Sequence, residues 1–188
     1  MRTDGMSGFL SEDTVRGHVE YYRRLRCRCS IFEKSVPEIR GCTIRRLMEM
    51  RIDCRMKNEI LPSFIAAKSH ELYFSSFCEG RKICPKIKEY YSSEAAFLYE
   101  LFQLARGMSG GFLYVARDRC GKPVGIPEEE IRSYRGFSPC LALDMAEHAY
   151  FPDYGFEKER YISAALSRLN LCEIFSEGNY KLYLDTPI

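Results

Sequence analysis

Residues 141–171 read LALDMAEHAYFPDYGFEKERYISAALSRLNL and contain a carboxylate and an imidazole, Asp144 and His148, four residues apart in an otherwise apolar run. Elsewhere the 188-residue chain has only two histidines, His18 and His70. Three imidazoles and one carboxylate are a complete ligand set for a redox-active iron or manganese ion. If the four side chains converge, a single metal site accounts for every histidine in the chain.

Each of these residues also has an ordinary structural interpretation. A histidine in a helix is more often a surface or core residue than a ligand, and Asp144 and His148 could pair on one helix face. Asp144, however, directly follows the apolar run PCLAL at residues 139–143. A carboxylate that ends such a run needs a cation, which favours the metal site.

The wider pattern resembles the C-terminal signature of the iron/manganese superoxide dismutases. That signature is D-x-W-E-H-A-Y-Y, then D-Y, a later tyrosine and a closing N-W. The positions that match it without a gap are Asp144, Glu147, His148, Ala149, Tyr150, Asp153, Tyr154, Tyr161 and Asn170.

Three upstream segments resemble further motifs of the same family. LSEDTVRGHVEYYRRL, at residues 10–25, is similar to its first metal-binding helix and places His18 on a ligand position. KSHELYF, at residues 68–74, resembles N-H-x-F-Y-W and places His70 on the second ligand position. MSGGFLYV, at residues 108–115, resembles the strand motif G-S-G-W-x-W-L-V.

The resemblance implies the ligands and the fold. It assigns one iron or manganese ion per chain to His18, His70, Asp144 and His148. It also implies an α+β fold, with an α-helical hairpin domain at residues 1–80 and a C-terminal domain at residues 85–188. The second domain is expected to carry a small three-stranded antiparallel sheet flanked by helices, and the metal site to lie between the domains.

The activity that the resemblance implies is conversion of superoxide to oxygen and hydrogen peroxide by one-electron cycling of the bound metal. Iron and manganese have the redox couple for this reaction, and zinc has none. The alternative is a non-dismutase member of the same fold that acts as a metal-binding structural or interaction subunit.

Several residues near the expected site depart from the family pattern. The family places a gate tyrosine two helical turns beyond the first histidine, where this chain has Arg26, and Tyr22 stands one turn beyond His18. Ala66 occupies one of two places for a solvent-binding glutamine, and the family tryptophans are replaced. The changes indicate one of two histories. Either the residues drifted in a paralogue that lost its catalytic rate, or the surroundings of the metal were altered to work with different residues. On the second interpretation, Tyr22 and Arg26 share the helix stripe of His18 and serve as the gate, with Arg26 attracting superoxide.

The position of Glu147 predicts how the chains assemble. In the family, the glutamate at this position crosses a dimer interface and holds the other subunit's copy of the metal-binding histidine. The resemblance therefore implies a homodimer across the face that carries Glu147 and Tyr150.

Composition limits the other possibilities. The net charge is only +2, so we do not expect nucleic acid to be a partner. The arginines in RRLRCRC, at residues 23–29, are read either as a solvated helix face or as a guide for an anion. The chain shows neither a secretory signal nor a membrane span, and its nine cysteines include no C-x-x-C pair. We expect a cytoplasmic protein with reduced thiols, with a metal at Cys27/Cys29 and disulfides as the alternatives.

Local signals predict the elements. Ser11 is expected to cap a helix that runs past Leu25, and Ser92 or Ser93 to cap another. Further helices are predicted over residues 37–54, 58–77, 158–169 and 173–180. Three short apolar runs bounded by turns predict strands at residues 111–116, 123–126 and 139–144.

Overall fold

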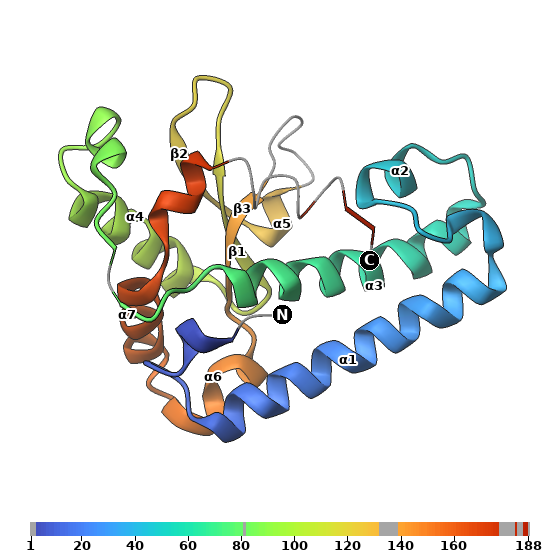
Figure 1. The fold of residues 1–188 in the computed structure, drawn as a ribbon, viewed down its shortest axis with the longest axis horizontal. Coiled ribbons are helices and arrows are strands. Elements are labelled where there is room, and N and C mark those ends of the chain that lie inside the picture. The colour runs from blue at the N-terminus through green and yellow to red at the C-terminus, as the bar shows by residue number, and fades with distance from the viewer. Residues whose placement is uncertain (1–2, 81, 132–138, 177–182, 184–185, 188) are drawn as a thin grey trace.

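The computed structural model describes residues 3–80, 82–131, 139–176, 183 and 186–187. A long helical hairpin forms one side of the molecule, and a small sheet with its covering helices forms the other (Figure 1). The hairpin consists of α1 (Glu12–Ser35) and α3 (Cys54–Ser75), which pack against each other. Two short elements join them, the 3₁₀ helix η2 (Pro37–Ile39) and α2 (Ile44–Glu49).

The remaining elements follow in chain order. The 3₁₀ helix η1 (Asp4–Met6) precedes the hairpin. After the hairpin come η3 (Pro85–Glu89), α4 (Glu94–Gly107), β1 (Phe112–Arg117), β2 (Pro123–Pro127), α5 (Glu128–Ile131), β3 (Pro139–Asp144), α6 (Glu147–Tyr154), α7 (Lys158–Arg168) and η4 (Leu171–Phe175).

Side-chain caps fix where the hairpin helices begin. The Ser11 hydroxyl accepts a hydrogen bond from the Thr14 amide at 3.2 Å, as predicted for the start of α1. The Asp53 carboxylate accepts from the amides of Arg55 and Met56, so α3 begins at Cys54, before the predicted residue 58. Pro62 consequently lies inside α3, where its missing N–H removes one helix hydrogen bond.

The helix predicted over residues 37–54 is wrong as a continuous element. Gly41 has φ +66, a left-handed conformation that ends the first short helix. Thr43 then caps α2 by accepting a hydrogen bond from the Arg46 amide at 3.2 Å. Of the helix predicted over residues 173–180, η4 covers the beginning, and residues 177–180 lie outside the described residues.

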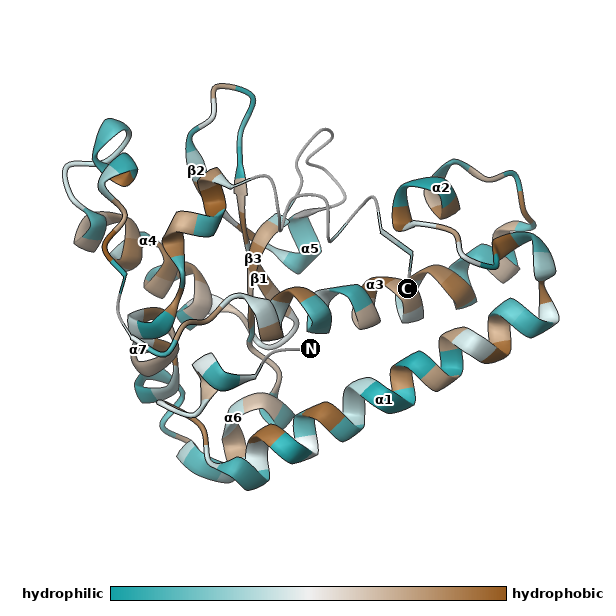
Figure 2. Ribbon diagram, viewed as in Figure 1, coloured by the Kyte–Doolittle hydropathy of each residue, from teal (hydrophilic) through white to brown (hydrophobic). Residues whose placement is uncertain are grey.

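The sheet has the strand order β2-β1-β3 and is antiparallel throughout. β1 is the central strand and places Phe112 opposite Asp144 and Leu113 opposite Leu143. All six residues of β3 are buried, and α3 packs against this strand. β1 and β3 are mainly brown in Figure 2, which agrees with their burial. The predicted α+β fold with a three-stranded antiparallel sheet is confirmed.

Two apolar clusters stabilise this arrangement. The larger lies around the sheet and joins residues of η1, α3, α4 and α7, including Phe97 and Tyr161, which are fully buried. The smaller lies toward the loop end of the hairpin, where Phe64 packs with Ile39 and Leu47. Each fully buried large apolar side chain contributes roughly 1.5–3 kcal/mol to folding.

The segment after α3 is tied to the end of α7. The Cys78 amide donates to the Arg168 carbonyl at 3.1 Å, and the Asn170 amide donates to the Ser76 carbonyl at 2.9 Å. The division of the chain at residues 80–85 stays a prediction. In the part of the chain that the structure describes, none of the helices is both long enough and apolar enough to cross a bilayer.

Candidate metal centre

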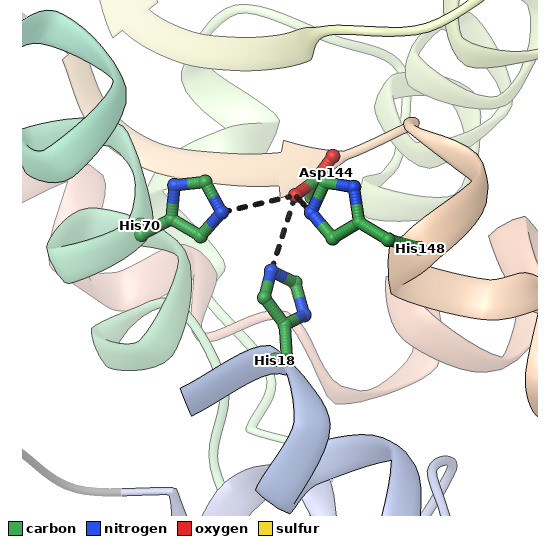
Figure 3. Close-up of side chains that lie close together, drawn as sticks. All are labelled: His18, His70, Asp144 and His148. Carbon is green, nitrogen blue, oxygen red and sulfur yellow. Dashed lines mark ion pairs between the residues drawn. The ribbon is translucent and has the colours of Figure 1, made fainter. Parts of the chain in front are cut away.

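Four elements each bring one polar side chain to a common point (Figure 3). His18 comes from α1, His70 from α3, Asp144 from the end of β3 and His148 from the first turn of α6. Oδ2 of Asp144 lies 3.2 Å from Nε2 of His18, 3.2 Å from Nε2 of His148 and 3.7 Å from Nε2 of His70. One ligand atom from each residue lies within 4.8 Å of all the others.

The sheet orients the carboxylate of Asp144. Gly111, with φ +74, directly precedes β1, and its carbonyl accepts a hydrogen bond from the Met145 amide at 2.8 Å, which holds the end of β3 in place. Oδ1 of Asp144 accepts the Ala146 amide at 2.9 Å. The Tyr161 hydroxyl donates to the Asp144 carbonyl at 2.7 Å. With its other oxygens engaged, Asp144 presents Oδ2 to the three imidazoles.

The atoms at the centre are buried and lack directed hydrogen bonds. In the described part of the chain they are Nε2 of His18, Nε2 of His70 and Oδ2 of Asp144, with Nδ1 of His18 beside them. Buried polar atoms without partners destabilise a fold. A cation at their centre would satisfy the inward-facing atoms together, and nitrogen and oxygen ligands of this kind suit iron or manganese. The four side chains therefore fit such an ion.

The protonation states match those that metal binding needs. Burial lowers the pKa of His70 to about 4, so its imidazole is neutral at physiological pH. Its Nδ1 is 2.7 Å from the Ala66 carbonyl, an arrangement that places the proton on Nδ1 and leaves Nε2 free to bind. Burial alone would raise the pKa of Asp144, but the adjacent His148 and His18 outweigh it and hold the carboxyl pKa below its usual range.

Aromatic rings enclose the centre. The ring centroids of Tyr73 and Phe74 lie 4.9 Å and 5.3 Å from that of His18, and Phe112 lies 5.1 Å from His70. All three aromatic side chains are buried. They restrict the imidazoles to one orientation and exclude water from that side of the site.

Tyr21 is a site residue that the sequence interpretation missed. Its ring centroid lies 4.6 Å from that of His148 and 5.3 Å from that of His70, and the residue is 43% exposed. A cavity of about 570 Å³ opens beside it, lined also by His18, His148 and Asp153. Tyr21 lies three residues after His18 in α1, and that i, i+3 spacing was the signal available in the sequence.

Tyr22 and Arg26 converge on a different residue. Oε1 of Glu71 accepts the Tyr22 hydroxyl at 2.7 Å and Nη1 of Arg26 at 3.0 Å. Burial and the neighbouring Glu71 raise the pKa of Tyr22 above its usual range. The residues that line the 570 Å³ cavity include neither of them. Their proposed gate role stays a prediction.

Glu71 is also the partner of a buried lysine. Nζ of Lys68, in a residue only 2% exposed, lies 2.7 Å from Oε2 of Glu71. The same ammonium donates to the Thr186 hydroxyl and the Pro187 carbonyl, both at 2.9 Å. Glu71 thus links α1 to α3, and Lys68 links α3 to Thr186 and Pro187, next to His70 in sequence.

The structure separates the two residues of the expected dimer face. Glu147 is exposed in the first turn of α6, next to His148, whose side chain is 37% exposed. Tyr150 is only 8% exposed and stacks on Tyr161 with a centroid distance of 5.2 Å. Of this pair, Glu147 is therefore the residue available to a second subunit.

Comparison with known proteins agrees with this geometry. Residues 79–176, just over half of the chain, match the family described as iron/manganese superoxide dismutases, C-terminal domain. Over 123 residues the chain is 27% identical to an iron superoxide dismutase of Cupriavidus metallidurans, covering 61% of this chain and 62% of that protein. It is 28% identical over 123 residues to those of Aquifex pyrophilus and Aquifex aeolicus, covering 58% of each.

The matched region spans about three-fifths of the length of these curated relatives. Asp144 and His148 lie within the residues that match the family, and His18 and His70 come from the hairpin helices α1 and α3. The sequence match, the sheet and the cluster at its edge agree, and the chain belongs to the iron/manganese superoxide dismutase family.

Proposed function

We propose that this protein is a superoxide dismutase that uses one iron or manganese ion per chain. The observation that supports this most directly is the convergence of His18, His70, Asp144 and His148, whose ligand atoms lie within 4.8 Å of one another. Family membership supplies the reaction class. In this proposal the bound metal supplies the reversible one-electron couple that oxidises one superoxide to oxygen and reduces a second to hydrogen peroxide.

The four ligand residues have defined tasks in this proposal. Asp144, kept ionised in a fully buried position, contributes one negative charge that favours a highly charged cation. His18 and His70 are also buried, and each contributes one imidazole nitrogen to the centre. His148 is the most exposed of the four, so the site is open to a small substrate on its side.

The peroxide-forming half of the reaction also needs protons. The Tyr21 phenol stands at the cavity, over two of the ligand imidazoles, and is accessible to solvent. A phenol can donate a proton and regain it from water. We propose that Tyr21 holds this proton. Tyr22 and Arg26 remain the candidates for the gate that the sequence pattern suggests.

Metal analysis together with a superoxide assay tests the proposal. We expect purified protein to contain about one iron or manganese per chain, and His148→Ala to lose most of the metal and the activity. Glu157→Gln is the control for metal binding, because it changes an exposed carboxylate that pairs with Arg160 and is not one of the four converging residues. Metal bound at one per chain without activity would favour the structural or interaction subunit. Undiminished metal binding by His148→Ala would contradict the site itself.

We also propose that the active form is a homodimer built on the Glu147 face. Phe151, which is 43% exposed, lies in α6 together with Glu147. An exposed aromatic ring beside an exposed carboxylate is a feature that a second subunit would cover. Light scattering should report a dimer at micromolar concentration, shifted toward monomer in Glu147→Ala. A monomer with fully bound metal would contradict this proposal.

A further inference from the structure

Two cysteines that lie far apart in the sequence meet away from the metal centre. Cys84 precedes η3, and Cys172 lies in η4. The backbone brings their segments together, because residues 76–78 hydrogen-bond to residues 168–170 and Phe77 forms a bridge with Leu169. The Cys84 amide also donates to Oε2 of Glu94 at 2.8 Å, which fixes this cysteine against α4.

The two thiols are neighbours. Sγ of Cys172 lies 3.7 Å from the carbonyl oxygen of Ile83, the residue that directly precedes Cys84. The side chains of Cys84 and Cys172 are within hydrogen-bonding reach of each other. Both residues belong to the described part of the chain, and both are free thiols.

The two thiols differ in their access to solvent. Cys84 is only 3% exposed and belongs to the main apolar cluster, whereas Cys172 is exposed. One thiol can therefore meet a soluble oxidant, while its neighbour is protected and adjacent. A buried cysteine by itself behaves as an inert small hydrophobic side chain. Beside an exposed thiol that can be oxidised, it can instead react with the oxidised sulfur.

We propose that Cys84 and Cys172 form a reversible disulfide when the protein meets hydrogen peroxide. The sulfur of Cys172 attacks one peroxide oxygen and the O–O bond breaks. The departing hydroxide takes the thiol proton of Cys172 and leaves as water, and Cys172 becomes a sulfenic acid. The sulfur of Cys84 then attacks the sulfenic sulfur, the S–O bond breaks, and the thiol proton of Cys84 leaves with the hydroxide as a second water. Two thiols are oxidised to one disulfide, and one peroxide is reduced to two waters.

The order of the two steps follows from the environments. Burial, followed by the contact with Cys172, raises the pKa of Cys84 to about 11, so this thiol is protonated and a poor first nucleophile. Cys172 is the thiol that peroxide can reach. The inference does not depend on a metal, so its outcome is separate from that of the proposed dismutase activity.

The disulfide would join the segment before η3 to the last described 3₁₀ helix. It would close a loop that contains the whole sheet and α6 and α7. Closing a long loop restricts the unfolded chain, so the oxidised protein should unfold at a temperature about 5–10 °C higher than the reduced protein.

The test uses the full chain, reduced and then treated with equimolar hydrogen peroxide. Alkylation followed by peptide mass mapping should find a Cys84–Cys172 linked peptide that dithiothreitol removes. Cys172→Ser, an exposed change that should preserve the fold, should abolish the link and the thermal shift. Cys120→Ser removes another exposed thiol and should keep both the linked peptide and the thermal shift.

A second variant keeps the result independent of folding defects. Cys84→Ala should leave a sulfenic acid on Cys172 that dimedone labels after peroxide treatment. The proposal is overturned if the folded wild type yields no Cys84–Cys172 peptide. It is also overturned if Cys172→Ser shows the same peroxide-dependent thermal shift as the wild type.

Discussion

At the scale of single residues, side-chain geometry changes which tyrosine is the best candidate for proton transfer. The sequence pattern directs attention to Tyr22, one turn beyond His18. In the structure, its hydroxyl donates to Glu71, whereas the Tyr21 ring covers His148 and His70 at the cavity. A hydroxyl already committed to a carboxylate is less available to a substrate than one that faces water.

We therefore predict different effects for two matched substitutions. Tyr21→Phe keeps the ring against His148 and His70 and removes only the hydroxyl, so it should slow the peroxide-forming half-reaction on the order of 100-fold, with metal content unchanged. Tyr22→Phe should retain most of the activity and lose about 1 kcal/mol of stability with the Glu71 hydrogen bond. Pulse radiolysis measures the rates of both half-reactions in the two variants. The opposite ranking would restore the hypothesis based on Tyr22 and Arg26.

The convergence of the four residues was predictable from the sequence, because each one sits in a contiguous motif whose register is fixed. Asp144 and His148 are four residues apart in one segment, and His18 and His70 are the only other histidines. The contacts of Tyr21 and of Glu71 were not predictable, because each depends on how α1 and α3 cross. A sequence gives the face of a helix on which a residue lies, and tertiary packing decides what that face contacts.

At the scale of elements, the bounds of helices and strands were predicted best where the local sequence signals were strong. Ser11 caps α1 and Ser93 caps α4, and the three predicted strands lie within one residue of their observed bounds. The failures occurred where a local signal was ambiguous. Asp53 starts α3 several residues before the predicted position, so Pro62 lies deeper in the helix than a start at residue 58 would place it. The short helix α6 was not predicted, because the motif around His148 was read as a set of ligands.

Glu71 shows how the elements of the hairpin are joined, and it leads to a prediction about stability. It is the counter-charge of Lys68, which is 2% exposed, and it also accepts bonds from Tyr22 and Arg26. Glu71→Gln should therefore destabilise the protein by roughly 3–5 kcal/mol, because it leaves a buried ammonium without a charged partner. Urea unfolding of the variant measures this change.

Glu20→Gln is the control for this prediction. Glu20 pairs with Arg23 and Arg24 on the exposed face of α1, at 3.7 Å and 3.6 Å. Exposed pairs of this kind contribute about 1 kcal/mol or less. If Glu71→Gln is as mild as Glu20→Gln, the Lys68–Glu71 pair has no structural role in joining the hairpin to the end of the chain.

At the scale of the whole molecule, the four converging residues connect the helical hairpin with the sheet and with α6. His18 and His70 come from the two arms of the hairpin, and Asp144 and His148 come from the sheet and the helix that follows it (Figure 3). A ligand that binds the folded chain and not the unfolded chain stabilises the fold by mass action. Metal at this site should therefore stabilise the whole molecule and not one element.

We predict that removing metal from the loaded protein with a chelator lowers its thermal unfolding midpoint by about 5–10 °C, as expected for metal at about 100 times its dissociation constant. The physical reason is that removal leaves Nε2 of His70 and Oδ2 of Asp144 buried without a partner. Differential scanning calorimetry of loaded and stripped protein measures the shift. His148→Ala is the control: it should unfold near the stripped wild type and be insensitive to the chelator. Equal midpoints for loaded and stripped protein, with one metal bound per chain, would mean that the cluster binds metal without contributing to the fold.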